Sequence, residues 1–402
     1  MSANYRRLGP VSITWMILYL GAAVCLGSGE TASNLPLAPP SEVGMDAARL
    51  AEIPDQMRSF VEKHQMSGAV TLVAKDGKIV HLAAVGMADV ANGRPMEKDT
   101  IFAIASMTKP ITATAVMILR DEGRLSLEDP VANYIPAFKE ARLAGKPPAR
   151  PITIRDLMTH TSGIGGGQQN QGTLAETVEA LAAQPLQFQP GEKWQYSPGL
   201  TVCGRVVEIV AKTPYEQFLA ERIFKPLGMK DTTFHPTPEQ QKRIAVLYKP
   251  GPEGKSIEPT EHWLSALTPD RSPNPSGGLF STAADLARFY QMILDGGRLG
   301  AARVVSEDAV REMTRLQTDD LKTGFTSGNG WGLGWGIVRQ PQGVTEMLSP
   351  GTFGHGGAFG TQGWVDPKRR MIFVLLIQRT GFGNGDESDI RAALQRLAVE
   401  AL

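Results

Sequence analysis

The sequence predicts an α+β fold, with an antiparallel sheet flanked by helices and a second, mostly helical lobe. Strand patterns lie near both ends of the chain, at about 69–84 and 331–378, and the residues between them carry helical patterns and long loops. Of the 402 residues, 42% are hydrophobic and 20% are charged, which is enough apolar material for a sizeable core. We expect a ligand site in the cleft between sheet and lobe.

The first 29 residues have the layout of a secretory signal. Arg6 and Arg7 precede the apolar run Val11–Leu26, and small residues follow from Gly27. The run is shorter than the roughly 20 residues that span a bilayer. We therefore expect a cleaved signal rather than a membrane anchor, and an exported protein, periplasmic or secreted, that meets a membrane only through this segment. Residues 30–44, rich in Pro and Ser, are expected to form a linker.

The folded domain is expected over residues 45–402, beginning with a helix. Asp46–His64 has apolar residues three or four positions apart, as on one face of a helix. Two strand-like runs follow, Ala69–Ala74 and Lys78–Ala84. Asp76-Gly77 between them is a strong signal for a hairpin turn.

The remaining elements complete the sheet and its covering helices. A helix is predicted from about Ser106 to Asp121. Trp331–Val338, Gly360–Val365 and Met371–Gln378 predict strands, and Asp386–Leu402 predicts a closing helix. The simplest packing joins the first hairpin to the last strands in one antiparallel sheet, which the terminal helices cover.

The composition excludes several classes of function. The 41 basic residues balance 41 acidic ones, and no basic stripe or zinc-finger spacing occurs, so we expect no nucleic-acid partner. Beyond the predicted signal, Cys203 is the only cysteine, which rules out a disulfide framework, and we expect it to be a small buried filler. Walker, Gly-x-Ser-x-Gly and His-Glu-x-x-His motifs are missing, and we expect neither a cofactor nor a metal.

Ser106 and Lys109 are the first candidates for chemistry. Chance alone predicts roughly one Ser-x-x-Lys match in a chain of this length, so the context must decide. Pro110 lacks an N–H and fits a helix only near its first turn, which places Ser106 at the helix N-terminus. Lys109 shares that face and, if shielded from water, can activate the hydroxyl. The alternative is a capping serine followed by a solvated lysine.

Three further segments carry polar or glycine-rich patterns. Tyr196 can relay protons if a nearby cation such as Lys109 lowers its pKa, and the alternative is an ordinary half-buried aromatic residue. In Gly354–Ala358, consecutive glycines let a substrate approach backbone N–H groups that can bind an oxyanion; the alternative is a loop with unusual dihedral angles. We expect His160 to brace its loop rather than to take part in catalysis.

In this order, the segments resemble the serine β-lactamase and penicillin-recognising superfamily, most closely class C β-lactamases and family VIII carboxylesterases. The resemblance extends from about Glu42 to Leu402 and implies a β-lactamase/transpeptidase-like fold. Each marker is weak by itself, and their common order makes the resemblance strong. The markers are Ile104–Lys109, Leu157–Gly163, Trp194–Ser197, Gly277–Thr282 and Gly354–Gly357.

The resemblance implies a role for each candidate. Ser106 is the nucleophile that becomes acylated, and Lys109 and Tyr196 are the proton-transfer pair. The N–H groups of Ser106 and Ala358 form the oxyanion hole. His355, Gly356 and Gly357 take the place of the Lys-Thr-Gly element that grips the substrate in relatives.

Two departures from the family pattern bear on the substrate. The Tyr-x-Asn element reads Tyr196-Ser197-Pro198, and proline has no side-chain amide to hold a substrate amide. A literal Lys322-Thr323-Gly324 exists, but only the His355 segment is followed by the Trp364–Pro367 run that resembles the family, so we choose His355. A neutral histidine binds a carboxylate poorly at pH 7. Both departures favour esters without a carboxylate.

The sequence thus leads to an exported serine hydrolase that cleaves carboxylic esters through a covalent acyl-enzyme on Ser106. Its expected partner is a small-molecule ester or acyl-peptide substrate. The alternative with the same chemistry is a β-lactamase or D-Ala-D-Ala carboxypeptidase acting on cell-wall peptides. An alternative of another class is a catalytically inactive binding protein on the same fold, but such a protein would not need Ser106, Lys109 and Tyr196 together.

Overall fold

The computed structural model describes residues 1–2, 35–165, 172–268 and 271–402. The predicted signal, apart from its first two residues, and the start of the predicted linker lie outside these ranges. The first helix, α1 (Ala47–Glu62), agrees with the prediction, and the side chain of its N-cap Asp46 accepts hydrogen bonds from two backbone N–H groups. In the described residues no helix has the length and apolar character needed to cross a membrane.

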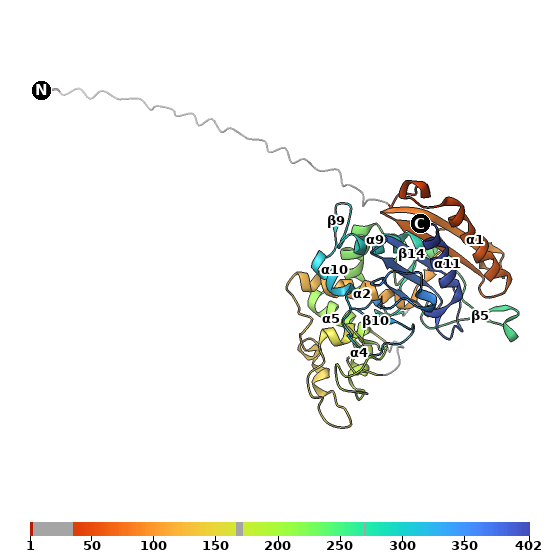
Figure 1. Ribbon diagram of the computed structural model, residues 1–402. Helices are drawn as coiled ribbons and strands as arrows, with labels where there is room; N and C mark the ends of the chain where they lie inside the picture. The colour runs from red at the N-terminus through yellow and green to blue at the C-terminus, as the bar shows by residue number, and fades with distance from the viewer. Residues whose placement is uncertain (3–34, 166–171, 269–270) are drawn as a thin grey trace. The chain divides into compact units, whose positions relative to one another are not determined.

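An antiparallel sheet joins the two ends of the chain, as predicted. The first hairpin turns at Asp76 and Gly77, both with positive φ, and Val70 of its first strand pairs with Leu376 near the C-terminus. Within the described residues the sheet has eight strands (Figure 1). In spatial order they are β10 (Asn329–Trp331), β11 (Gly336–Val338), β12 (Phe353–Gly356), β13 (Gln362–Asp366), β14 (Met371–Leu376), β1 (Gly68–Lys75), β2 (Lys78–Asp89) and β3 (Arg94–Pro95).

Both faces of the sheet are covered, because residues of its central strands β1, β13 and β14 are buried at almost every position. Alternate residues of a strand point to opposite faces. Val73 and Phe373 pack with α1 and the terminal helix α11 (Asp389–Glu400), which lie side by side (Figure 1). Leu72 and Val374 pack on the other face with the large cluster that includes α2 (Thr108–Asp121) and α9 (Ala283–Leu294).

The region between the strands is mostly helical, as predicted. Helix α2 is buried from Thr108 to Leu119 and packs against α5, so it forms the centre of this region. Its other helices are α3 (Ile154–Met158), α4 (Leu174–Ala182), α5 (Gly199–Ala211), α6 (Tyr215–Leu219), α7 (Lys225–Leu227), α8 (Pro238–Gln241) and α10 (Glu307–Thr314). The short strands outside the main sheet are β4 (Phe102–Ala103), β5 (Tyr248–Pro250), β6 (Ile257–Pro259), β7 (Phe280–Ser281), β8 (Arg298–Leu299) and β9 (Ala302–Arg303).

Two predictions differ from the structure. Trp331–Val338 is not one strand but the turn and flanks of the β10–β11 hairpin, in which Gly332 N–H donates to Trp335 O and Gly334 has a φ of 78°. The described end of the predicted linker is attached to the sheet. Leu37 forms a parallel bridge with Ile79, and Leu35 is buried.

Candidate active site

Ser106 lies in a tight turn that leads into α2. The turn is a 3₁₀ helix, Ala105–Met107, and α2 begins two residues after the serine rather than at it. Ala105 has a φ of 44°, a left-handed conformation that is uncommon for a residue with a side chain and typical of functional turns. The hydroxyl of Thr108 holds the turn by donating to Ala105 O at 2.7 Å. Ser106 is left half-buried.

Lys109 is completely buried beside this serine. Its Nζ donates to Ser106 Oγ at 3.1 Å and to the backbone carbonyl of Ser276 at 2.7 Å. Among the described residues, no carboxylate lies within 4 Å of Nζ. Burial therefore dominates and lowers the pKa of Lys109 to about 7. A large fraction of this amine is neutral near pH 7 and able to accept the serine proton.

Tyr196 shares this cluster, but its ionisation differs from the expectation. Lys109 Nζ lies 4.5 Å from the centre of the Tyr196 ring, and the phenol is near enough to Ser106 to interact with its hydroxyl. Burial raises the pKa of Tyr196 well above its ordinary value, and the interaction with Ser106 offsets this only in part. Tyr196 is therefore a neutral phenol that can pass a proton on, and Lys109 is the stronger candidate for the base.

His160 holds the Tyr196 segment in place, as expected of a bracing residue. Its Nδ1 accepts from the N–H of Ser197 at 3.1 Å, and its carbonyl accepts from Gln195 N–H at 2.9 Å. The imidazole is fully buried and packs on the Tyr196 ring, with 4.6 Å between ring centres. Burial, with the nearby Lys109 charge, lowers the pKa of His160 well below its usual range, so the ring stays neutral.

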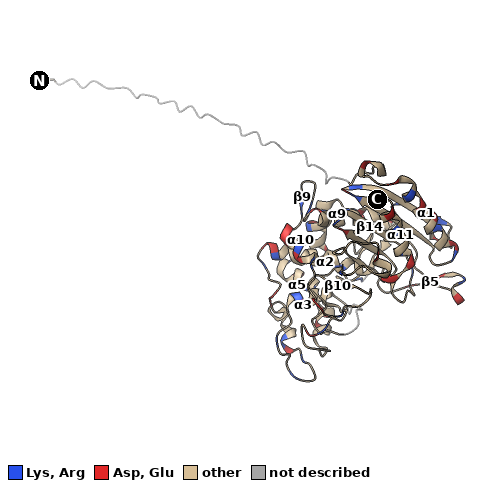
Figure 2. Cartoon of the chain, viewed as in Figure 1, with Lys and Arg blue, Asp and Glu red and all other residues tan. Residues whose placement is uncertain are grey.

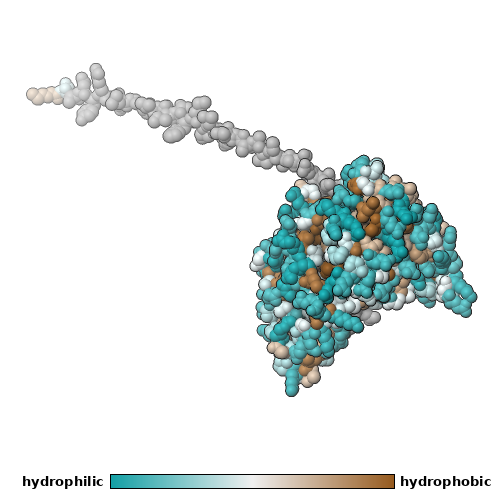
Figure 3. Space-filling model, viewed as in Figure 1, coloured by the Kyte–Doolittle hydropathy of each residue, from teal (hydrophilic) through white to brown (hydrophobic). Residues whose placement is uncertain are grey.

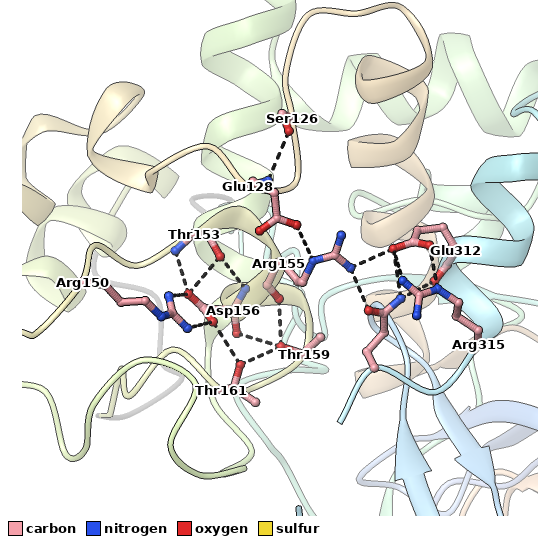
Figure 4. A network of polar contacts seen from close by, with 11 residues as sticks. Ser126, Glu128, Arg150, Thr153, Arg155, Asp156, Thr159, Thr161, Glu312 and Arg315 are labelled. Atoms are coloured by element: carbon pink, nitrogen blue, oxygen red, sulfur yellow. Dashed lines mark hydrogen bonds and ion pairs between the residues drawn. The ribbon is translucent and has the colours of Figure 1, made fainter. Parts of the chain in front are cut away.

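A polar network anchors the short helix α3 that presents His160 (Figure 4). Asp156 accepts from both terminal nitrogens of Arg150 at 2.6 and 2.8 Å, and also forms a capping box with Thr153. On the other side, Arg155 bonds Glu128 and Glu312. Charge-assisted pairs with two parallel hydrogen bonds fix geometry as well as energy. The network therefore sets the position of the turn behind Tyr196.

The predicted glycine-rich element is the strand β12 and the turn after it. His355 is buried, donates from Nδ1 to Gly356 O at 2.6 Å, and lies 6.1 Å from Tyr196 between ring centres. Burial and the charge of Lys109 lower the pKa of His355 to about 3, so it provides no cation at neutral pH. A side chain at Gly357 would come within 2.5 Å of Ile104 O, so only glycine lets β12 approach the serine turn this closely. Ala358 follows Gly357 in the chain and is exposed.

Aromatic side chains line the same site, among them Phe325, which the sequence did not single out. The edge of Phe325 faces Tyr196 at 4.7 Å and Trp194 at 5.9 Å, and Trp331 faces His355 at 5.4 Å. Phe325 is 41% exposed, which is unusual for phenylalanine. It follows the literal Lys322-Thr323-Gly324, which therefore lies in a loop at the site and not in a strand of the sheet.

The Gly277–Thr282 marker has a structural explanation. This segment lies next to the chain that leads into the serine turn. Phe102 pairs with Ser281 in the β4–β7 ladder, and Ile104 N–H donates to Leu279 O. Just before it, Ser276 supplies the carbonyl that holds Lys109. A backbone carbonyl carries no residue-type signal, so sequence reasoning could not assign this role to Ser276.

Comparisons with known proteins show the family and the fold of the chain. The family model described as Beta-lactamase matches residues 53–398. Esterase EstB of Burkholderia gladioli is 31% identical over 380 residues, covering 85% of this chain and 94% of the esterase. A putative D-alanyl-D-alanine carboxypeptidase of Salmonella typhimurium is 29% identical over 380 residues, covering 86% of each. The solved structure of EstCE1, a hydrolase with promiscuous acyltransferase activity, has a TM-score of 0.74 at 24% identity, covering 90% of this chain and 98% of EstCE1.

Proposed function

Since this chain belongs to the beta-lactamase family, we propose that it is an exported serine hydrolase that cleaves carboxylic esters through an acyl-enzyme on Ser106. The observation that carries the proposal is the buried Lys109 amine, 3.1 Å from the Ser106 hydroxyl and with its pKa lowered to about 7. A binding protein would gain nothing from a lysine buried without a counter-ion, because that burial costs stability. The kinship with Esterase EstB supports the choice of esters.

The steps follow from the placement of the groups. Lys109 takes the Ser106 proton while Oγ attacks the ester carbonyl carbon, and the carbonyl oxygen becomes an oxyanion near the N–H groups of Ser106 and Ala358. When the tetrahedral intermediate collapses, the bond to the alcohol oxygen breaks, and Tyr196 passes a proton from Lys109 to the departing alkoxide. A water molecule then attacks the acyl-enzyme by the reverse route, which releases the acid and restores Ser106.

Replacing Ser106 by alanine tests the nucleophile. Ser106→Ala should abolish ester hydrolysis and leave the fold intact, because the covalent bond to the acyl group needs Oγ. Intact-mass spectrometry after a slow ester substrate or a fluorophosphonate should show one adduct on the wild type. Ser162→Ala, at another buried serine near the His160 turn, is the matched control and should keep the adduct. An adduct on the Ser106→Ala protein would refute the assignment.

The substrate class can be tested on one preparation. We expect kcat/KM for p-nitrophenyl butyrate to exceed that for nitrocefin, because Pro198 and Gly356 lack the side chains with which relatives hold a lactam. Losing about 2–3 kcal/mol of such positioning lowers kcat/KM by a factor of roughly 30 to 150. A preference for nitrocefin would replace the esterase proposal with the lactamase or peptidase alternative, to which the Salmonella relative points by name.

A further inference from the structure

A carboxylate fills the space that a side chain at position 356 would occupy. If Gly356 carried a Cβ, that atom would lie 1.7 Å from Asp386 Oδ1 and 2.6 Å from Gln362 Nε2. Asp386 comes from the turn before α11, a segment thirty residues further along the chain. In the family that this chain resembles, the residue at this strand position helps to grip the carboxylate of the substrate. Here the same space holds a negative charge.

Hydrogen bonds hold this carboxylate in a defined position. Gln362, which pairs with Gly356 across the β12–β13 ladder, donates from Nε2 to Asp386 Oδ1 at 3.0 Å. The backbone N–H of Asp386 donates to Asn384 Oδ1 at 3.1 Å. The amide of Asn384 in turn bonds the carbonyl of Phe325, the aromatic residue beside Tyr196. The turn that carries Asp386 is thus tied to both β12 and the Phe325 loop.

The carboxylate of Asp386 forms no direct ion pair among the described residues, although the buried Arg391 lies close enough to attract it. Among the described residues, no lysine or arginine nitrogen lies within 4 Å of its carboxylate. Arg391 Nη1 donates to the Asp386 backbone carbonyl at 2.7 Å, and its guanidinium lies over the Trp364 ring. Burial lowers the pKa of Arg391 to about 10, and the charge of Asp386 partly offsets this, so the two groups attract each other without a direct contact between guanidinium and carboxylate. Burial is the main cause of the raised pKa of Tyr196, and the charge of Asp386 adds to it, so the carboxylate acts on the reaction centre. His355 stays neutral and offers no compensating charge.

We propose that Asp386 determines specificity, by repelling substrates that carry a carboxylate near the scissile ester and so favouring neutral or cationic ones. This inference rests on the proposed function in that it concerns the same site. The proposed function assumes only that the side chains that hold a substrate carboxylate in relatives are missing. This inference adds that Asp386 repels such a carboxylate. A site that has only lost its grip would bind anionic and neutral substrates alike, whereas a fixed carboxylate discriminates between them.

A matched pair of esters measures this discrimination. One is the mono-p-nitrophenyl ester of glutaric acid, which carries a free carboxylate, and the other is its methyl ester, which is neutral. Asp386→Asn removes the charge and keeps the shape and the acceptor for Gln362. The quantity measured is kcat/KM for the anionic ester divided by kcat/KM for the neutral ester, and we expect this ratio to rise about tenfold in the variant. In the wild type, added salt should bring the two kcat/KM values closer together, because it screens the repulsion. Asp389→Asn, at an exposed position on the same segment, is the control and should leave the ratio unchanged.

An equilibrium measurement separates this inference from the proposed function. Calorimetry can compare the affinities of phenylboronic acid and 3-carboxyphenylboronic acid, which need the serine but no turnover. If the wild type hydrolysed no ester and Asp386→Asn still favoured the carboxylated boronate, the esterase proposal would fail and the inference would stand. The esters could instead be hydrolysed while the kcat/KM ratio and the boronate affinity ratio change by less than twofold in Asp386→Asn, or change equally in Asp389→Asn. That result would refute the role of Asp386 and leave the esterase proposal standing.

Discussion

Lys109 shows how one buried side chain sets the chemistry of a site. An ammonium group enclosed without a carboxylate loses its hydration and gains no ion pair, so the neutral amine is favoured. Two hydrogen bonds, from Nζ to Ser106 Oγ and to Ser276 O, hold the amine in place. The protein thereby keeps a base ready near neutral pH where an exposed lysine would be protonated.

The pH dependence follows with a definite sign. The protonated amine cannot accept the serine proton, so kcat/KM should be low below the Lys109 pKa and rise as the pH passes through about 7, reaching a plateau above it. The profile of p-nitrophenyl butyrate hydrolysis between pH 5 and 9, corrected for the spontaneous reaction, measures it. Ser106→Ala should give no such profile. An activity that fell as the pH rose through 7 would show that Lys109 is not the base.

At the scale of elements, we predict that the turn containing His160 supports both stability and activity. His160→Ala removes the acceptor for Ser197 N–H and leaves that group buried, at a cost of about 1–3 kcal/mol in the free energy of unfolding. It also frees Tyr196 to shift, and a 1 Å misplacement of a catalytic group can cost about a hundredfold in rate. We expect kcat to fall by roughly that factor. Kinetics and thermal unfolding measure the two effects.

Two variants distinguish positioning from a general loss of stability. His160 has a φ of 61°, which asparagine tolerates, and the asparagine side chain again offers an acceptor. His160→Asn should therefore restore part of kcat as well as stability. His235→Gln, at an exposed histidine, should change neither. Equal kcat for the alanine and asparagine variants would contradict the positioning role.

The elements also show which features a sequence can reveal. The β1–β2 hairpin was predictable because Asp76-Gly77 needs positive φ and sits between two apolar runs. The β10–β11 turn was not, since glycines at alternate positions look like a packed strand until Gly334 is found with positive φ. Ser106, Lys109 and Tyr196 stand in recognisable segments. Phe325 and Asp386 do not, because loops brought to the site by tertiary packing carry no local pattern.

At the scale of the molecule, charged residues of both signs are spread over the described elements. Lys and Arg alternate with Asp and Glu over the elements in the view of Figure 2. In the same view, hydrophobic residues form small areas among hydrophilic ones (Figure 3). That the substrate is a small molecule stays a prediction, which the ester assays described above test.

Export is a prediction about the whole chain. We expect the mature protein to begin beyond Leu26 and to be found outside the cytoplasm, because the apolar run before it has the layout of a cleaved signal. Cleavage there would spare the attachment at Leu37 and Ile79, where the folded part begins. N-terminal sequencing of protein from the periplasm or medium tests this. Material that retained Val11–Leu26 would indicate an uncleaved anchor.

The pairing of Val70 with Leu376 has a consequence for the order of events during synthesis. The ribosome releases the N-terminal hairpin early, but the strand that must lie beside it emerges almost last. Closing so long a loop is slow, and until it closes the hairpin exposes an unpaired apolar edge. The nascent chain therefore cannot complete its sheet before translation ends. If the chain is exported as we propose, this delay would leave it unfolded while it passes through a translocation pore.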